Sequence, residues 1–270
     1  KPMYGVIIAF KNFSPAKGVI GSEWVGIKHF IDFFCNPYFF RLMKNTLVIS
    51  LSTLVFSFPA PIILALLINE IRSKWFSRIV QLIVYLPHFI SLVVVCGLIL
   101  KFTSDKSIIN DIAVLFGHER VSFLNHPKYF VPVYVISDIW QSAGWNSIIY
   151  LAALTSVEQQ LYEAAIIDGA SRWRQTLHIT IPGIAPTIIT MFILRIGNML
   201  NVGYEKIILL YNPVTYETAD VISTYVYRKG LIENSWSFST AVGLFNSIIN
   251  FTLLIFANRL SRKINEISLW

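Results

Sequence analysis

The sequence predicts an all-α membrane protein, and three observations support this class. Of the 270 residues, 55% are hydrophobic and only 14% are charged, whereas a typical soluble domain has about 25% charged residues. Five stretches are long and apolar enough to cross a bilayer. The basic residues that give the net charge of +7 lie mostly between these stretches, as expected for loops near anionic head groups. This composition disfavours a soluble enzyme with a large core.

The five stretches are predicted to be helices, because a helix satisfies its own backbone hydrogen bonds where lipid cannot. They cover residues 46–68, 79–100, 129–157, 179–204 and 234–258. Only Asp138 and Arg195 carry a charge inside them. The apolar residues 2–10 are too short to span, and we expect them to be the end of a first helix. About six transmembrane helices are therefore predicted, in a single domain over residues 1–270.

The loops give the chain a predicted orientation. The short basic loop 69–78 and the tail after Asn258 fall on the same side of an alternating topology. Lys and Arg in short loops favour the cytoplasm, so this side is predicted to be inside. The longer loops on the opposite side contain more Lys and Arg in total, at a similar density.

The segment 158–186 joins two of the spans and has a distinctive pattern. Residues 158–168 are rich in strong helix formers, and Gly169 is suited to end a helix with a positive φ. Ser171 is a plausible N-cap for a second short helix through residue 179, before Pro182 and Pro186 mark entry into the next span. The small residues Ala164, Ala165 and Ala170 leave little side-chain bulk. The pattern predicts a helix-turn-helix on the membrane face that fits a groove on another protein.

Within this segment, Glu163-Ala164-Ala165, followed by Gly169, Ile179 and Pro182, resembles the EAA loop of binding-protein-dependent ABC importer permeases. Ile181 stands where that family often has Leu. Two further segments, PMYGVIIAFKNF and YNPVTYETADVISTYVYRKG, are similar to the carbohydrate-uptake subgroup that includes complex-saccharide permeases. The resemblance extends over nearly the whole chain.

This resemblance implies a type I ABC importer transmembrane domain in which residues 158–186 form a cytoplasmic coupling loop. The loop would dock into a cleft of an ATPase subunit, with Glu163 paired to a basic residue there and Gly169 permitting the turn. The coupling residues would be Glu163, Ala164, Ala165, Asp168, Gly169 and Ala170. The implied partners are a second permease, two ATPase subunits and an extracytoplasmic solute-binding protein, at a bacterial inner membrane. The alternative is an ordinary cytoplasmic loop with a capped amphipathic helix.

Polar residues inside the predicted spans are candidates for a saccharide pathway, because such groups are costly in lipid without a partner or a water-filled cavity. Asp138, Gln141, Ser142 and Trp145 share one helical face, and two further polar stripes lie near Arg195 and Asn246. The candidates are Asp138, Trp140, Gln141, Trp145, Tyr150, Arg195, Asn198, Asn246 and Asn250. The alternative is that these residues join helices by hydrogen bonds; Arg195 is expected to be functional or ion-paired.

Several function classes are disfavoured by what the sequence lacks. It contains no GxxxxGK[ST] phosphate loop, so the chain is predicted not to be an enzyme, with ATP and Mg²⁺ bound by partner subunits. No metal site and no nucleic acid are expected. A secondary transporter is the rival function, although only one carboxylate lies within a span; a membrane-embedded enzyme is the third. An acidic saccharide such as alginate and a neutral oligosaccharide both stay open as substrates.

Overall fold

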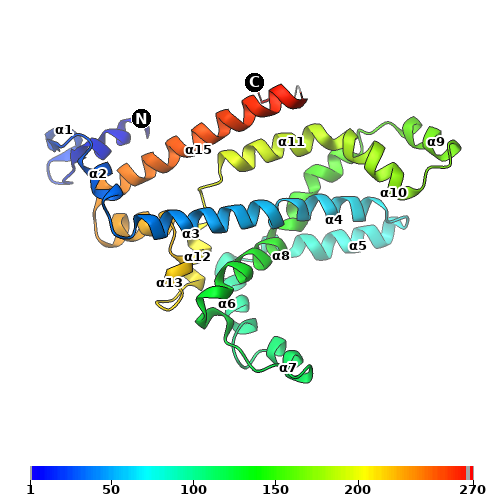
Figure 1. The fold of residues 1–270 in the computed structure, drawn as a ribbon, viewed down its shortest axis with the longest axis horizontal. Coiled ribbons are helices and arrows are strands. Elements are labelled where there is room, and N and C mark those ends of the chain that lie inside the picture. The colour runs from blue at the N-terminus through cyan, green and yellow to red at the C-terminus, as the bar shows by residue number, and fades with distance from the viewer. Residues whose placement is uncertain (1, 266–267, 270) are drawn as a thin grey trace. The chain divides into compact units, whose positions relative to one another are not determined.

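The computed structural model describes residues 2–265 and 268–269 and is mainly helical (Figure 1). The chain packs into two compact units. Unit 1 contains Lys1–Ser52, Leu92–Val135 and Asn198–Leu253, and unit 2 contains Thr53–Ser91, Ile136–Gly197 and Leu254–Trp270.

Among the described residues, three helices are long and apolar enough to cross a membrane. They are Phe39–Asn69, Arg172–Gly197 and Trp236–Lys263. The first combines α3 (Phe39–Ser52), a π-helical turn (Thr53–Ser57) and α4 (Pro59–Asn69), and the last lies within α15 (Trp236–Asn265). Each overlaps a predicted span, but the boundary predicted at residue 204 is wrong. The helix ends at Gly197, and residues 198–203 form a turn followed by an irregular segment.

The predicted span over residues 79–100 contains Pro87, where the sequence favours a kink, and the helix is broken there. Helix α5 (Lys74–Tyr85) tightens into a 3-10 turn at Leu86–Phe89, and α6 (Leu92–Phe102) then begins in a new direction. The bend between the two parts is 100°. Pro87 explains the break, because proline has no N–H for the helical ladder and its ring clashes with the preceding turn.

The remaining predicted span, residues 129–157, coincides with α8 (Pro127–Leu154). This helix is long enough to span but is not among the three that are also apolar enough. Its polar residues lower its mean hydropathy and include Asp138, Gln141, Ser142 and Asn146.

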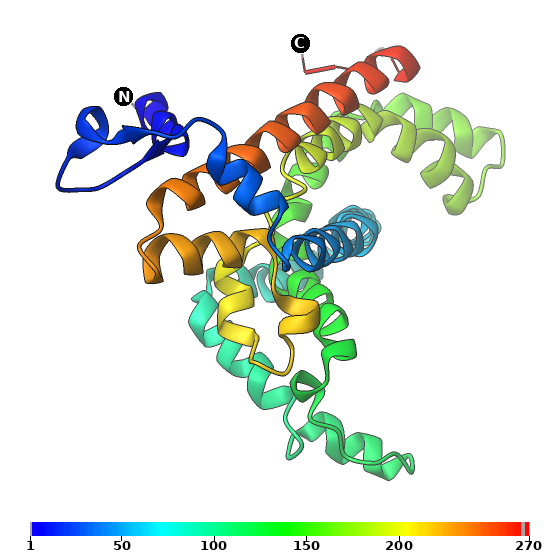
Figure 2. The same ribbon diagram turned by 60° about the vertical axis from the view of Figure 1, so that its left-hand side comes forward.

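The N-terminal segment of unit 1, blue in Figure 2, folds back on itself. Residues predicted to end a first helix form a 3-10 helix, Pro2–Phe10. Antiparallel strands β1 (Lys11–Asn12) and β2 (Glu23–Trp24) pair Lys11 with Trp24. The remaining short helices here are α1 (Gly18–Gly21) and α2 (Lys28–Phe34).

The rest of unit 1 consists mainly of short helices and turns. These helices and turns are α7 (Ile108–Leu115), a 3-10 turn (Phe123–Asn125), α12 (Tyr204–Leu210), α13 (Tyr216–Ala219), α14 (Ile222–Tyr227) and a π-helical turn (Arg228–Ile232). Of these, α13 and α14 pack against α3, and α12 packs against α6. Phe33 of α2 is buried with Leu42, Ile222, Tyr225 and Val242 in one hydrophobic cluster.

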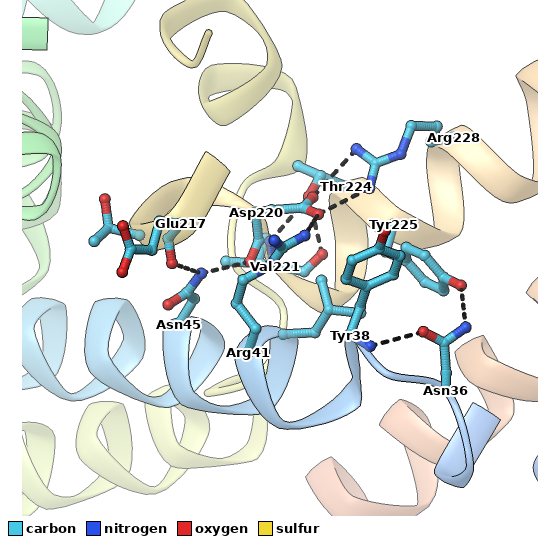
Figure 3. A network of polar contacts seen from close by, with 12 residues as sticks. Asn36, Tyr38, Arg41, Asn45, Glu217, Asp220, Val221, Thr224, Tyr225 and Arg228 are labelled. Carbon is cyan, nitrogen blue, oxygen red and sulfur yellow. Dashed lines mark hydrogen bonds and ion pairs between the residues drawn. The ribbon is translucent and has the colours of Figure 1, made fainter. Parts of the chain in front are cut away.

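A buried carboxylate joins these elements in unit 1 (Figure 3). Asp220 is fully buried and accepts hydrogen bonds from Arg228 Nη2 at 2.8 Å, Arg41 Nη2 at 3.5 Å and Thr224 Oγ1 at 2.8 Å. Asn45, also in α3, donates from its Nδ2 to the main-chain carbonyl of Asp220 at 2.9 Å. The start of α3 is thereby fixed to the segment that leads into α14.

The charge balance of this network depends on Asp220. Burial alone would lower the pKa of the Arg228 guanidinium, but the hydrogen bonds and charge of Asp220 outweigh it and raise that pKa above its ordinary value. Arg228 therefore stays charged, and the one carboxylate of Asp220 lies against two partly buried guanidinium groups.

Unit 2 has its own apolar cluster, formed where α4, α8 and α11 (Ile181–Gly197) pack together. Ala65, Tyr150, Leu154 and Ile184 are its buried members. Helices α8 and α5 come into close contact at Gly144 of α8. A glycine is required there, because an added Cβ would lie 1.9 Å from the carbonyl oxygen of Val84 in α5. Small residues allow such close contacts between membrane helices.

We predict that Asp220→Asn destabilises the chain by about 3 kcal/mol, because removing one partner of a buried ion pair leaves the other charge uncompensated. The matched control is Asp111→Asn, since Asp111 forms an exposed pair with Arg120 at 2.6 Å and such pairs contribute about 1 kcal/mol at most. Thermal unfolding of the detergent-solubilised protein measures both. Equal shifts in the two variants would contradict the stabilising role of Asp220.

Candidate functional site

The segment 158–186 lies in unit 2 and begins with the predicted helix, α9 (Gln159–Ile167). Its end is a Schellman motif, in which Ala170 N–H donates to the Ala165 carbonyl at 2.8 Å and Gly169 N–H to that of Ile166 at 3.0 Å. Gly169 has a φ of +72°. That left-handed conformation strains any residue with a side chain, so the predicted helix stop at Gly169 is confirmed.

The second helix, α10 (Arg172–Gln175), begins at Ser171 as predicted, and Ser171 Oγ accepts from Arg174 N–H at 3.5 Å. The predicted end of this second helix at residue 179, before Pro182, is wrong. A π-helical turn at Thr176–Thr180 leads directly into α11, so one helix continues through Pro182 and Pro186. The wider turn explains this difference, because it lies just where Pro182 provides no N–H for an ordinary helical bond.

Two side-chain hydrogen bonds fix the turn between α9 and α10, which Figure 1 shows joined by a short loop. Gln175 is buried, and its Nε2 donates to the Ala170 carbonyl at 2.9 Å. The Tyr162 hydroxyl lies 2.9 Å from Thr180 Oγ1. The helix-turn-helix is thus supported by its own contacts.

This helix-turn-helix exposes large apolar side chains. Ile167 is 86% exposed and Trp173 is 70% exposed, while Ile166 is also on the surface. Glu163, Ala164, Asp168 and Gly169 are exposed as well, whereas Ala165 and Ala170 are half-buried and border a hollow of about 330 Å³. Clustered exposed apolar side chains are typical of a protein–protein interface.

The nine pathway candidates divide between the two units. In unit 2, Trp145 stacks on His88 with ring centroids 4.6 Å apart, beside the break at Pro87. Asp138 and Gln141 are half-buried and Trp140 is exposed. Tyr150 is buried in the apolar cluster of unit 2, a placement that agrees with a packing role.

Arg195 lies in the last turn of α11 and is exposed. Within the described part of the chain it forms no ion pair. Arg195 was expected to be functional or ion-paired. The second role finds no partner among the described residues, and the guanidinium is open to a ligand or a partner subunit.

In unit 1, two of the candidates join α15 to the turn that follows α11. Asn250 Oδ1 accepts from Leu200 N–H at 3.0 Å, and Asn246 Nδ2 donates to Asn201 Oδ1 at 2.9 Å. Asn198 Oδ1 accepts a longer contact, 3.4 Å, from Asn201 Nδ2. These are the contacts that the packing alternative predicts.

Asn246 also lines a cavity. The sequence pattern indicated the polar stripe on one wall of this cavity but not its aromatic residues. Ser239 and Gly243, from the same helical stripe of α15, line it too, together with Tyr204, Tyr227 and Trp236. The aromatic residues lie in or beside a segment that looks like a polar loop in the sequence. Across residues 2–265 and 268–269, no cluster of His, Cys, Asp or Glu could hold a metal ion.

Comparisons with known proteins agree with this geometry. The family model described as "Binding-protein-dependent transport system inner membrane component" matches residues 57–266. The chain is 48% identical to the polygalacturonan/rhamnogalacturonan transport system permease protein YteP of Bacillus subtilis (strain 168), over 98% of this chain and 83% of that protein.

Two solved structures are similar over nearly the full length. One is a crystal structure of a bacterial ABC transporter involved in the import of the acidic polysaccharide alginate, with a TM-score of 0.90, 48% identity, and coverage of 98% of this chain and 90% of that one. The other is a bacterial alginate ABC transporter in complex with an alginate pentasaccharide-bound periplasmic protein, with a TM-score of 0.91, 46% identity, and coverage of 99% and 90%.

The matched family, the fold and the glycine-hinged segment lead to one conclusion: the chain belongs to the binding-protein-dependent transport system inner membrane components and is a permease of an ABC importer.

Proposed function

We propose that this permease forms, with a second permease subunit, the path through which a saccharide crosses a bacterial inner membrane. Residues 158–186 are its coupling loop, and two cytoplasmic ATPase subunits supply the energy. The observation that carries the coupling role is the exposure of Ile166, Ile167 and Trp173 on a turn held by its own hydrogen bonds. Such a rigid apolar surface loses little conformational freedom on docking.

A solute-binding protein delivers the saccharide on the opposite side. Support comes from the similar transporter structure, which is in complex with a saccharide-bound periplasmic protein. The orientation follows from the basic loop 69–78 and from the coupling loop, which must face the ATPases.

The substrate class that we propose is an acidic saccharide containing uronate residues. The relative at 48% identity is named for polygalacturonan and rhamnogalacturonan, and a similar structure belongs to an importer of the acidic polysaccharide alginate. Arg195 is exposed and forms no ion pair with any residue that the structure describes. It suits a carboxylate, because guanidinium groups bind carboxylates with two parallel hydrogen bonds. The net charge of +7 also favours an anionic substrate.

We predict that Glu163→Lys and Gly169→Pro abolish transport-coupled ATP hydrolysis while the subunit still inserts and assembles. The first variant reverses the charge that the ATPase cleft receives, and the second places a ring with a fixed φ near −65° where the chain needs +72°. The measurement is substrate-stimulated ATPase activity of the reconstituted importer.

The chain offers a matched control for each variant. Glu119 is exposed in the loop after α7, and Gly117 ends α7 with a φ of +81°. Glu119→Lys and Gly117→Pro should therefore leave coupled hydrolysis within about twofold of wild type, as usual for surface changes away from an interface. Normal coupling in Glu163→Lys and Gly169→Pro would remove the assignment.

A separate prediction concerns Arg195. Arg195→Ala should lower the uptake of alginate pentasaccharide by about 10- to 100-fold, because a hydrogen bond to a charged group contributes about 1.5–3 kcal/mol. Arg259→Ala removes an exposed arginine in the last part of α15 and serves as control. Unchanged uptake in a well-assembled Arg195→Ala complex would show that this guanidinium does not contact the substrate.

A further inference from the structure

A cavity of about 420 Å³ lies wholly within unit 1, between α12, α14, the π-helical turn Arg228–Ile232 and the start of α15. The residues that define its chemistry are Tyr204, Tyr227, Trp236, Ser239, Gly243 and Asn246. Its volume falls in the range of small-molecule sites, which are mostly apolar with a few convergent polar groups.

One wall of this cavity is aromatic. The rings of Tyr204 and Tyr227 stack with centroids 5.6 Å apart, and Trp236 is 37% exposed at the first turn of α15. Flat rings of this kind give large contact area to the apolar C–H face of a sugar ring, while the tyrosine hydroxyls can bond to its oxygens.

A buried acceptor in the cavity wall lacks a partner. Asn246 is only 9% exposed, and its Nδ2 donates to Asn201 Oδ1. Its Oδ1 is buried and accepts no hydrogen bond from any described residue. An unsatisfied buried acceptor is costly, and a rotation of the Asn246 side chain toward the cavity would let a hydroxyl group supply the missing donor.

The described residues that line the cavity include no charged side chain. The nearby Arg228 is already held by Asp220, with its Nη1 and Nη2 at 3.3 and 2.8 Å from the two carboxylate oxygens. The cavity is therefore suited to a neutral ring with hydroxyl groups, and a carboxylate would find no cationic partner among its lining residues.

We propose that this cavity binds one pyranose ring of the transported saccharide, by stacking on Trp236, Tyr204 and Tyr227 and by a hydroxyl hydrogen bond to Asn246. It recognises the uncharged face of the sugar, whatever acidic groups the chain carries elsewhere. This inference rests on the proposed function. In the proposed orientation, the segment 205–233 is extracytoplasmic, so the site would meet the saccharide as the solute-binding protein releases it.

Gly243 provides a sharp test, because a Cβ added there meets no atom within 4 Å. Gly243→Met therefore begins its side chain in open space at the cavity wall and extends bulk into the cavity, and methionine is a strong helix former. Gly97→Met is the matched control, since Gly97 is also helical, also has open space around its added Cβ, and lies in α6 outside the cavity.

The experiment uses the complete importer in proteoliposomes, with alginate pentasaccharide and trigalacturonate as probes. Gly243→Met should lower the initial uptake rate by about tenfold or more, as expected when ring contacts are lost, and Gly97→Met should stay close to wild type. Trp236→Ala should lose uptake and Trp236→Phe should keep most of it.

Equal uptake by Gly243→Met and Gly97→Met would overturn the inference, and would show that lipid or the second permease covers the cavity. Loss of uptake in Trp236→Phe as severe as in Trp236→Ala would also count against ring stacking. If the wild-type importer takes up neither probe, the proposed acidic substrate is wrong. The same variant pairs are then compared with a neutral oligosaccharide, and equal uptake by Gly243→Met and Gly97→Met there would overturn the inference.

Discussion

The proposed coupling segment, residues 158–186, reverses direction within a few residues because Gly169 adopts a left-handed backbone conformation, with a φ of +72°. The two hydrogen bonds of the Schellman motif then close α9, and Ser171 opens α10 directly afterwards. Without this turn, Ile166, Ile167 and Trp173 would not be presented together on one short, rigid element. The proposed transfer of energy from ATP hydrolysis depends on that rigidity, because a flexible loop would lose conformational entropy on docking instead of transmitting movement.

In unit 1, a buried ion-pair network fixes the irregular segments. One buried carboxylate, Asp220, holds Arg41 from α3 and Arg228 from the turn after α14. The segment between α11 and α15 thereby becomes ordered structure that bears a cavity, although its sequence has the polarity of a loop. A structured segment of this kind suits a permease that must receive a substrate from a separate protein.

Much of the architecture was predictable, because apolar stretches without charges have few alternatives to membrane helices. The stop at Gly169 and the cap at Ser171 were predictable for a similar local reason. A kink at Pro87 was also predictable, although its size of 100° was not. The continuation through Pro182 and the helix end at Gly197 were not predictable, because tertiary contacts decide how a helix accommodates proline or stops. Asp220 and the aromatic cavity were missed because residues distant in sequence create them. Family membership now removes the secondary-transporter alternative, whereas the roles of the pathway candidates stay predictions.

Site-specific photo-crosslinking in the assembled importer tests docking of the coupling loop most directly. A benzophenone amino acid at Ile167, which is 86% exposed, should crosslink to an ATPase subunit, and the same probe at Ile108, 63% exposed in α7, should not. This result would place the apolar turn in the ATPase cleft. An importer that assembles and hydrolyses ATP, yet yields no ATPase crosslink from Ile167 or neighbouring Ile166, would contradict the proposed coupling.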